Sequence, residues 1–203
     1  AARRRGGRGR SARGARGVRP LPAGRGFGFV NAIIGGAIPK EGIPAVQKGV
    51  TEGLAKGAWA GYPIVDVRVT LFDGKHHEVD SSEQAFKICG SMAFKKAFLK
   101  ANPQLLEPMM SVNVTTPEEF AGGVTGNICG KRGRISGMEP LSNGQQIKAV
   151  VPLANMFGYA SELRNMTQGR ASFTMHFEQY EVVPLRIAEE VVAERRKKMG
   201  NKE

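Results

Sequence analysis

The chain has 203 residues, of which 41% are hydrophobic, and a formal net charge of +12. This length allows one large domain or two small ones, and the apolar content is sufficient for real cores. The charge is uneven, because nine arginines and no acid lie in residues 1–25, which leaves 30 − 9 = 21 basic against 18 acidic residues elsewhere. A basic tail gives only non-specific, salt-sensitive affinity for phosphate, so net charge alone does not establish a nucleic-acid partner.

Cysteine usage and hydropathy indicate a reducing, cytoplasmic setting without a membrane. Cys89 and Cys129 each stand in an apolar stretch and have no paired or metal-ligand spacing, so we expect neither a metal site nor a cysteine nucleophile. No apolar run approaches the roughly 18 residues that span a bilayer. An arginine-rich, acid-free start is also typical of organelle transit peptides, although this one has more glycine and less serine than they use.

The first part of the chain predicts an α+β module. Residues 3–25 are almost wholly Arg, Gly and Ala, a composition that is typical of disorder when taken alone. Strands are expected over 26–34 and 64–72, the second from strict alternation that places Asp66 on its polar side. Apolar residues at helical spacing predict a helix over 43–55.

A second helix is expected over residues 81–101. Asp80, with Glu83 three residues later, has the pattern of a capping box at its start, and Asn102-Pro103 ends it. Its buried face is expected to comprise Phe86, Ile88, Cys89, Met92, Ala93 and Phe94.

The second part of the chain predicts six elements in the order βαββαβ. Strands are expected over 109–114, 134–139, 146–151 and 171–180, and helices over 117–129 and about 155–166. This order is that of the ferredoxin-like sandwich. A last helix over 184–198 carries Ile187, Val191 and Val192 toward an apolar partner. A change in composition over 102–107 is the expected domain boundary.

Five collinear motifs resemble the fourth and fifth domains of elongation factor G: GFGFVNAIIGGAIPKEGIPAVQKGV, GYPIVDVRVTLFDGKHHEVDSSEQAFKICGSMAFKKA, LEPMMSVNVTTPEEF, KRGRISGMEP and VVPLANMFGYASELRNMTQGRASF. They cover most of residues 26–180. The resemblance implies an α+β fold of two small domains. These are a module similar to domain 2 of ribosomal protein S5 over 1–102 and a ferredoxin-like domain over 103–183. A C-terminal helix over 184–203 would pack back on the first domain.

The same resemblance implies a function on the ribosome, in GTP-dependent translocation of tRNA and mRNA. The tip of the first domain would enter the decoding-side A site, and the second domain would lie near the stalk base and the sarcin-ricin loop. The implied partners are 16S and 23S rRNA, stalk-base proteins, tRNA and mRNA, with the chain a monomer. GTP, Mg and GTPase activity would belong to the parent protein. This chain has no phosphate loop, so we expect no cofactor and no enzymatic activity in it.

The tip is matched at two places in the sequence. His77 corresponds to the family's tip histidine, which contacts the codon–anticodon helix, with Lys75 and His76 beside it. Solvated loop residues are the alternative interpretation of the two histidines. Three further tip residues follow from a match to the family's GGRG motif: Gly7, Arg8 and Gly9.

A second basic cluster follows the predicted helix over 117–129. Lys131, Arg132 and Arg134 can cradle rRNA phosphate at a helix end, or they simply complement the negative end of the helix dipole. Arg170 precedes the last strand. The resemblance implies that it lies near the stalk base and rRNA, and a surface arginine at a helix end is the alternative.

Residues 10–19 depart from the family pattern. RSARGARGVR has the family's spacing between GGRG and PLP but no strand pattern where the family has one. Because Arg, Gly and Ala all have GC-rich codons, two compensating frameshifts are one interpretation. An ordered strand over 10–18 would support it.

A stand-alone RNA-binding protein is the alternative function, with an Arg/Gly-rich tail and a ferredoxin-like sheet that binds single strands. The predicted sheet strands lack the aromatic pair that such sheets use to stack bases. An enzyme is a third possibility, although no catalytic arrangement of Ser, His, Asp or Cys stands out.

Overall fold

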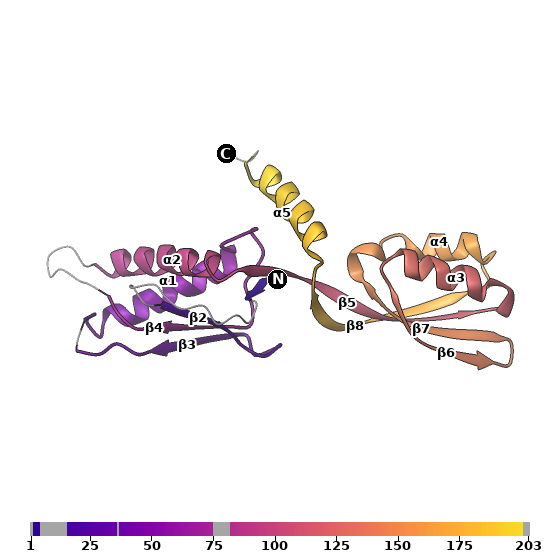
Figure 1. The fold of residues 1–203 in the computed structure, drawn as a ribbon, viewed down its shortest axis with the longest axis horizontal. Coiled ribbons are helices and arrows are strands. Elements are labelled where there is room, and N and C mark those ends of the chain that lie inside the picture. The colour runs from indigo at the N-terminus through magenta and orange to yellow at the C-terminus, as the bar shows by residue number, and fades with distance from the viewer. Residues whose placement is uncertain (1, 5–15, 36, 75–81, 201–203) are drawn as a thin grey trace. The chain divides into compact units, whose positions relative to one another are not determined.

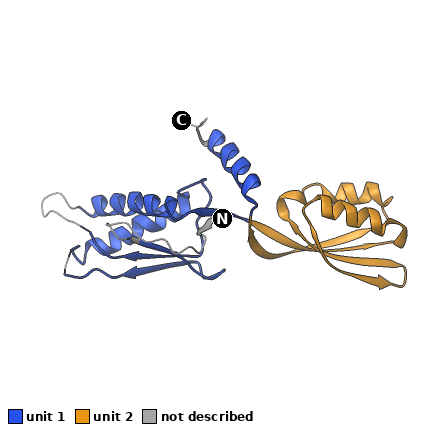
Figure 2. Ribbon diagram, viewed as in Figure 1, with its two compact units in different colours: residues 1–106, 183–203 blue, residues 107–182 orange. Residues whose placement is uncertain are grey.

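The computed structural model describes residues 2–4, 16–35, 37–74 and 82–200. The chain divides into two compact units, one formed by residues 1–106 with 183–203 and the other by residues 107–182 (Figures 1 and 2). Both units combine helices with sheet, so the predicted α+β class with two small domains is confirmed.

The first unit has a three-stranded sheet in the order β2-β4-β3. Strand β2 (Arg16–Pro20) is antiparallel to β4 (Val67–Leu71), and β3 (Phe27–Asn31) is parallel to it. Helices α1 (Gly42–Lys56) and α2 (Glu83–Leu99) pack against one face of this sheet (Figure 1). The buried core between them comprises Val18, Val50, Leu54, Ile64, Val67, Val69, Phe94 and Phe98.

Helices α1 and α2 approach each other closely at Gly49. A Cβ there would lie 2.0 Å from the carbonyl oxygen of Lys87, so no other residue fits without moving a helix. Helix α2 begins after Ser82, whose hydroxyl accepts a hydrogen bond from the Ala85 N–H at 3.2 Å. Ser82 is therefore the N-cap in place of the predicted Asp80, which lies outside the described residues.

The predicted buried face of α2 is partly wrong. Ile88 and Met92 are 50% and 57% exposed, and Cys89 is also exposed. The residues that pack inward are Gly90, Phe94 and Phe98, which recur every four residues and form one stripe. Residues 88 and 92 project from the opposite side of the helix, where no described element covers them.

Asp66 is buried, which contradicts its predicted place on the polar side of a strand. It adopts a left-handed conformation with φ 54°, and β4 begins only at the next residue. Its two carboxylate oxygens accept hydrogen bonds from the backbone N–H groups of Gly24 (3.1 Å) and Gly26 (2.9 Å). Its carbonyl accepts a third from Leu21 at 2.7 Å. Asp66 thus fixes the loop between β2 and β3 to the start of β4.

Two segments of the arginine-rich start are strands, so the expectation of disorder is wrong for them. Strand β1 (Ala2–Arg4) pairs antiparallel with the first residues of β5 (Pro103–Thr116), and β2 pairs with β4. Hydrogen bonds to these neighbouring strands stabilise the extended backbone, although the local composition by itself favours disorder. The frameshift interpretation predicts an ordered strand over 10–18; residues 16–18 belong to β2, and residues 10–15 lie outside the described residues.

The second unit has the strand order β8-β5-β7-β6, which is that of the predicted ferredoxin-like fold. The further strands are β6 (Arg134–Leu141), β7 (Gly144–Pro152) and β8 (Ser172–Val182). Helices α3 (Glu118–Gly130) and α4 (Tyr159–Met166) cover one face, and a short helix η1 (Leu153–Asn155) precedes α4 (Figure 1). The core between them includes Val112, Val114, Val124, Ile128, Ile147, Ala149, Tyr159 and Leu163.

The C-terminal helix α5 (Leu185–Gly200) belongs to the first unit. Ile187 and Val191 pack in a cluster with Leu105, Trp59 and Tyr62. The guanidinium of Arg195 lies 5.3 Å from the centre of the Tyr62 ring, which adds a cation–π contact. Within the described residues, no helix is long and apolar enough to cross a membrane.

Replacing Asp66 with Ala should destabilise the first unit. The change leaves the N–H groups of Gly24 and Gly26 without acceptors. It also places an alanine, whose side chain makes no hydrogen bond, at a positive φ that is unfavourable for a residue with a Cβ. We expect a loss of roughly 1–3 kcal/mol in the free energy of unfolding. Urea denaturation followed by the fluorescence of Trp59, the single tryptophan, measures it. Asp66→Asn keeps one acceptor and should lose less; equal stability of all three proteins would contradict the role of the carboxylate.

Removing α5 after Pro184 should shift the fluorescence of Trp59 to longer wavelength. Trp59 is partly buried against the cluster to which Ile187 and Val191 contribute, so it gains water contact when they leave. A shorter truncation after Arg195 keeps these contacts and is the control. An unchanged spectrum in the longer truncation would mean that α5 does not cover Trp59 in solution.

Candidate nucleic-acid interface

The predicted basic cluster begins where α3 ends. The Arg132 N–H donates to the carbonyl of Cys129 at 3.1 Å, and the Gly133 N–H donates to that of Ile128 at 2.9 Å. This pair of bonds is the Schellman motif, which usually has glycine at the left-handed position. Here Arg132 occupies that position with φ 63°. The conformation costs about 1–2 kcal/mol for a residue with a Cβ, so other contacts must hold Arg132 in place.

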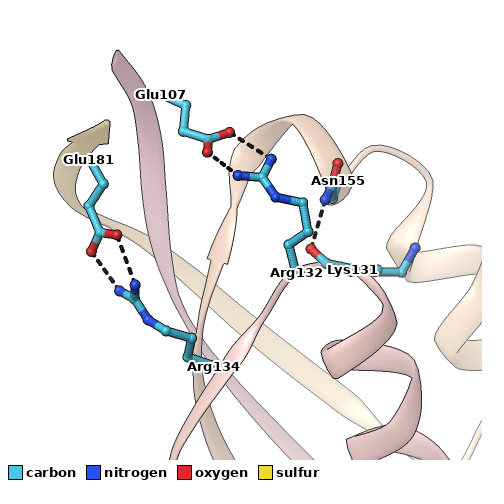
Figure 3. Close-up of polar contacts among 6 residues, drawn as sticks. All are labelled: Glu107, Lys131, Arg132, Arg134, Asn155 and Glu181. Carbon is cyan, nitrogen blue, oxygen red and sulfur yellow. Dashed lines mark hydrogen bonds and ion pairs between the residues drawn. The ribbon is translucent and has the colours of Figure 1, made fainter. Parts of the chain in front are cut away.

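Gly133 allows this turn to close. A Cβ at this position would lie 2.5 Å from Cγ2 of Ile128 and 2.6 Å from its carbonyl oxygen. The turn is also held from the other side, because the Asn155 side chain donates to the Lys131 carbonyl at 2.7 Å (Figure 3). The backbone that carries Lys131, Arg132 and Arg134 is therefore rigid.

Carboxylates hold the two arginines of this cluster in two-pronged ion pairs (Figure 3). Arg132 binds both oxygens of Glu107, one of them at 3.2 Å. Arg134 binds both oxygens of Glu181, at 2.9 and 2.6 Å. Hydrogen bonding by the Arg134 guanidinium lowers the pKa of the Glu181 carboxyl, and the same bond raises the pKa of Arg134. Both guanidinium planes are thus fixed in direction.

Lys131 has a carboxylate partner as well. Its Nζ lies 2.6 Å from Oε2 of Glu162, and the other oxygen of that carboxylate, Oε1, accepts a hydrogen bond from the Asn127 amide at 2.6 Å. The Lys131 contact, followed by that of Asn127, lowers the pKa of Glu162. Nearby, burial raises the pKa of the Tyr159 hydroxyl to about 12, and the charge on Glu162 adds to the effect. Tyr159 therefore stays neutral at physiological pH.

Arg170 lies apart from the other three basic residues. It pairs at 2.6 Å with Glu119, in the first turn of α3, and its guanidinium lies 4.7 Å from the centre of the Phe120 ring. Lys131 follows the last residue of the same 13-residue helix, so the two sites are about 20 Å apart along its axis. The predicted rRNA contacts thus form two separate sites.

The four basic side chains differ in how exposed they are, and therefore in what they can contact. The side chains of Arg134 and Arg170 are 62% and 49% exposed, whereas those of Arg132 and Lys131 are 30% and 18% exposed. An arginine has five N–H donors, and a two-pronged pair with a carboxylate uses two of them. Arg134 and Arg170 can therefore donate to a phosphate without leaving their carboxylates.

The predicted tip residues lie outside the described residues. These are Gly7, Arg8, Gly9, Lys75, His76 and His77. In the part of the chain that the structure describes, no three His, Cys, Asp or Glu side chains gather to hold a metal ion.

The acidic partners were not foreseen from the sequence. Glu107 and Glu181 come from strands β5 and β8, 25 and 47 residues away from their arginines. No local spacing connects such residues, because the strand order decides which of them meet. Cys129, expected in apolar surroundings, is exposed, as is Cys89.

The two α+β units define a two-domain protein with exposed arginines on its second unit. The family model for elongation factor G domain IV matches residues 1–102, and the model for the elongation factor G C-terminus matches residues 104–191. A crystal structure of a protein from Thermus thermophilus is similar, with 37% identity and a TM-score of 0.75, over 89% of this chain. The chain belongs to the elongation factor G family. It spans 27% of that Thermus chain.

Replacing Arg134 with Ala should raise the pKa of Glu181 toward the ordinary glutamate value of about 4.3. Because the folded-state pKa of Glu181 is lowered, the pair stabilises the protein above the unfolded-state pKa, and this stability is lost as pH falls through the folded-state pKa. The variant should therefore be less stable at neutral pH and equal to the parent in acid. Carboxyl NMR titration and melting temperatures against pH measure both effects. Arg164→Ala, at an exposed arginine of α4, is the control; a Glu181 pKa that does not move would contradict the pairing.

Proposed function

We propose that this chain is the ribosome-binding part of a translation elongation factor that promotes the translocation of tRNA and mRNA. The observation that carries the proposal is the match of consecutive elongation factor G domains to residues 1–102 and 104–191, nearly the whole chain. The parent protein is a cytoplasmic GTPase that supplies GTP and Mg in another domain. The ribosome-binding part acts as a monomer that positions RNA and uses no cofactor.

In this proposal the tip of the first unit enters the decoding-side A site. Lys75, His76 and His77 contact tRNA and mRNA there, because an imidazole donates to phosphate or ribose and stacks on a base. Gly7, Arg8 and Gly9 form the neighbouring part of the tip.

The second unit contacts 23S rRNA and the proteins of the stalk base. Arg134 and Arg170 supply the outward donors, since both are exposed and already oriented by carboxylates. Lys131 and Arg132 are more buried and hold the turn between α3 and β6 in shape. A rigid turn lowers the entropy lost on binding.

The stand-alone RNA-binding alternative has one supporting feature. Phe177 and Tyr180 on β8 are both about half exposed, with ring centres 5.2 Å apart. The central strands of the same sheet carry Ser111, Asn113 and Lys148 between their buried residues, and no aromatic side chain. The match of both units to one factor family favours the elongation factor.

The 203-residue chain should bind ribosomes whose A site is vacant and should be displaced when tRNA occupies that site. His77→Ala should weaken binding to the vacant ribosome, because the proposed contact at the tip is lost. His176→Ala, at an exposed histidine of β8, is the matched control and should leave binding unchanged. Co-sedimentation with ribosomes measures all three. Binding that is indifferent to A-site tRNA would overturn the assignment of the tip.

A further inference from the structure

The sheet of the first unit has one face that no described element covers. Helices α1 and α2 pack against the side chains of Val18, Val67 and Val69, each at most 3% exposed. Because side chains alternate along a strand, the residues between them point to the other face. On that open face lie Gly17 and Arg19 from β2, Gly28 and Val30 from β3, and Arg68 and Thr70 from β4, with Phe72 just beyond β4.

Two arginines stand side by side on this open face. The register of β2 against β4 places Arg19 directly opposite Arg68, and both side chains are exposed. Directly opposed residues have Cβ atoms about 5 Å apart, and like charges at such positions destabilise a sheet. Within the described residues neither arginine has an ion pair, in contrast to the arginines of the second unit.

No acidic side chain on the open face, as far as the structure describes it, offsets this repulsion. Asp66 lies next to the start of β4, but its carboxylate faces the N–H groups of Gly24 and Gly26. Two guanidinium groups this close form a ready site for anions, and phosphate fits their planar donors. The charge arrangement points to a phosphate-bearing ligand.

Glycines occupy part of the open face, and because they have no side chain, larger side chains from neighbouring positions can lie across them. A Cβ at Gly17 would lie 3.0 Å from Cε2 of Phe72, and one at Gly28 would lie 3.6 Å from Cδ1 of Leu21 and 3.7 Å from Cγ of Arg68. The Phe72 ring therefore lies against Gly17, and the stem of Arg68 lies along Gly28. Phe72 is still 42% exposed, so part of its ring is available to a ligand. An aromatic ring and paired arginines on one flat sheet provide stacking and phosphate contacts together.

We propose that this open face binds a single-stranded segment of RNA, with Arg19 and Arg68 on the phosphates and Phe72 stacked on a base. A duplex fits less well, because its bases are already stacked and a flat sheet enters neither groove of A-form RNA. An acidic peptide would satisfy the arginines but would leave the exposed ring without a stacking partner. None of its residues is among those assigned to the tip or to the second unit, so it adds a contact to the proposed function.

The test uses the 203-residue chain and a fluorescent single-stranded RNA of about twelve nucleotides, a length within the range of known single-strand sites. Arg19→Gln with Arg68→Gln should weaken binding at least about tenfold and reduce the salt slope by about 1.4, at about 0.7 for each lost phosphate contact. The matched control is Lys95→Gln with Lys96→Gln on the outer face of α2, which removes the same charge from exposed residues without ion pairs among those described. An equal loss in both double variants would mean non-specific attraction and would overturn the site.

The ring is tested separately from the charge. Phe72→Ala should weaken RNA binding by about 5- to 150-fold, the range for loss of one stacked base, and Phe72→Tyr should restore most of it. Circular dichroism melting shows whether each variant is folded, and the arginine variants should melt no lower than the parent because they relieve repulsion. Unchanged RNA binding by folded Phe72→Ala would exclude the stacking contact.

Ribosome co-sedimentation of the same variants separates the two proposals. If the arginine variants bind the RNA oligonucleotide normally but ribosomes poorly, the face contacts a protein and the RNA assignment is wrong. If they bind both normally, the open-face site is wrong while the proposed function stands. If the parent chain binds RNA through this face but does not bind ribosomes, the proposed function fails and the site remains.

Discussion

The buried carboxylate of Asp66 is the interaction on which the first unit depends. It holds the loop between β2 and β3 through Gly24 and Gly26, and it precedes the central strand β4 directly. The hydrogen bonds of Asp66 therefore fix the positions of β2 and β3 against the same end of β4. That register sends Val67 and Val69 into the core and places Arg19 opposite Arg68 on the other face. A local turn thus decides both the packing and the charge pattern of the sheet.

The arginines of the two units differ in whether they have carboxylate partners. In the second unit Arg132, Arg134 and Arg170 all have carboxylate partners, which fix their directions and reduce the repulsion between cations. On the open face of the first unit Arg19 and Arg68 have no such partners among the described residues. An arginine paired with a carboxylate has a fixed side-chain direction, whereas an arginine without such a partner adds net positive charge that attracts anions. Both arrangements suit the proposed contacts with RNA, at sites with different tolerance of salt.

Membership of the elongation factor G family gives these surfaces a common context. A factor with the proposed role on the ribosome meets phosphate on several sides, so separate basic sites on small rigid units are expected of it. Each unit builds its site from a sheet and two helices, and the precise direction of each side chain comes from short turns such as that at Arg132 and Gly133. Such turns hold side chains at low entropic cost when the partner arrives.

The sequence by itself determined the order of the main helices and strands from β3 onward, the α+β class and the family, because alternation in residues 67–71 and helical spacing in α1 depend only on neighbouring residues. The collinear motifs also gave the candidate tip and rRNA contacts, which stay predictions. Only the tertiary structure decided which side of α2 is buried, since Ile88 and Met92 are as apolar as the residues that pack inward. It also decided the partners of Arg132 and Arg134 and the burial of Asp66, because strands distant in sequence supply those contacts. Local pattern cannot specify a contact that depends on strand order and register.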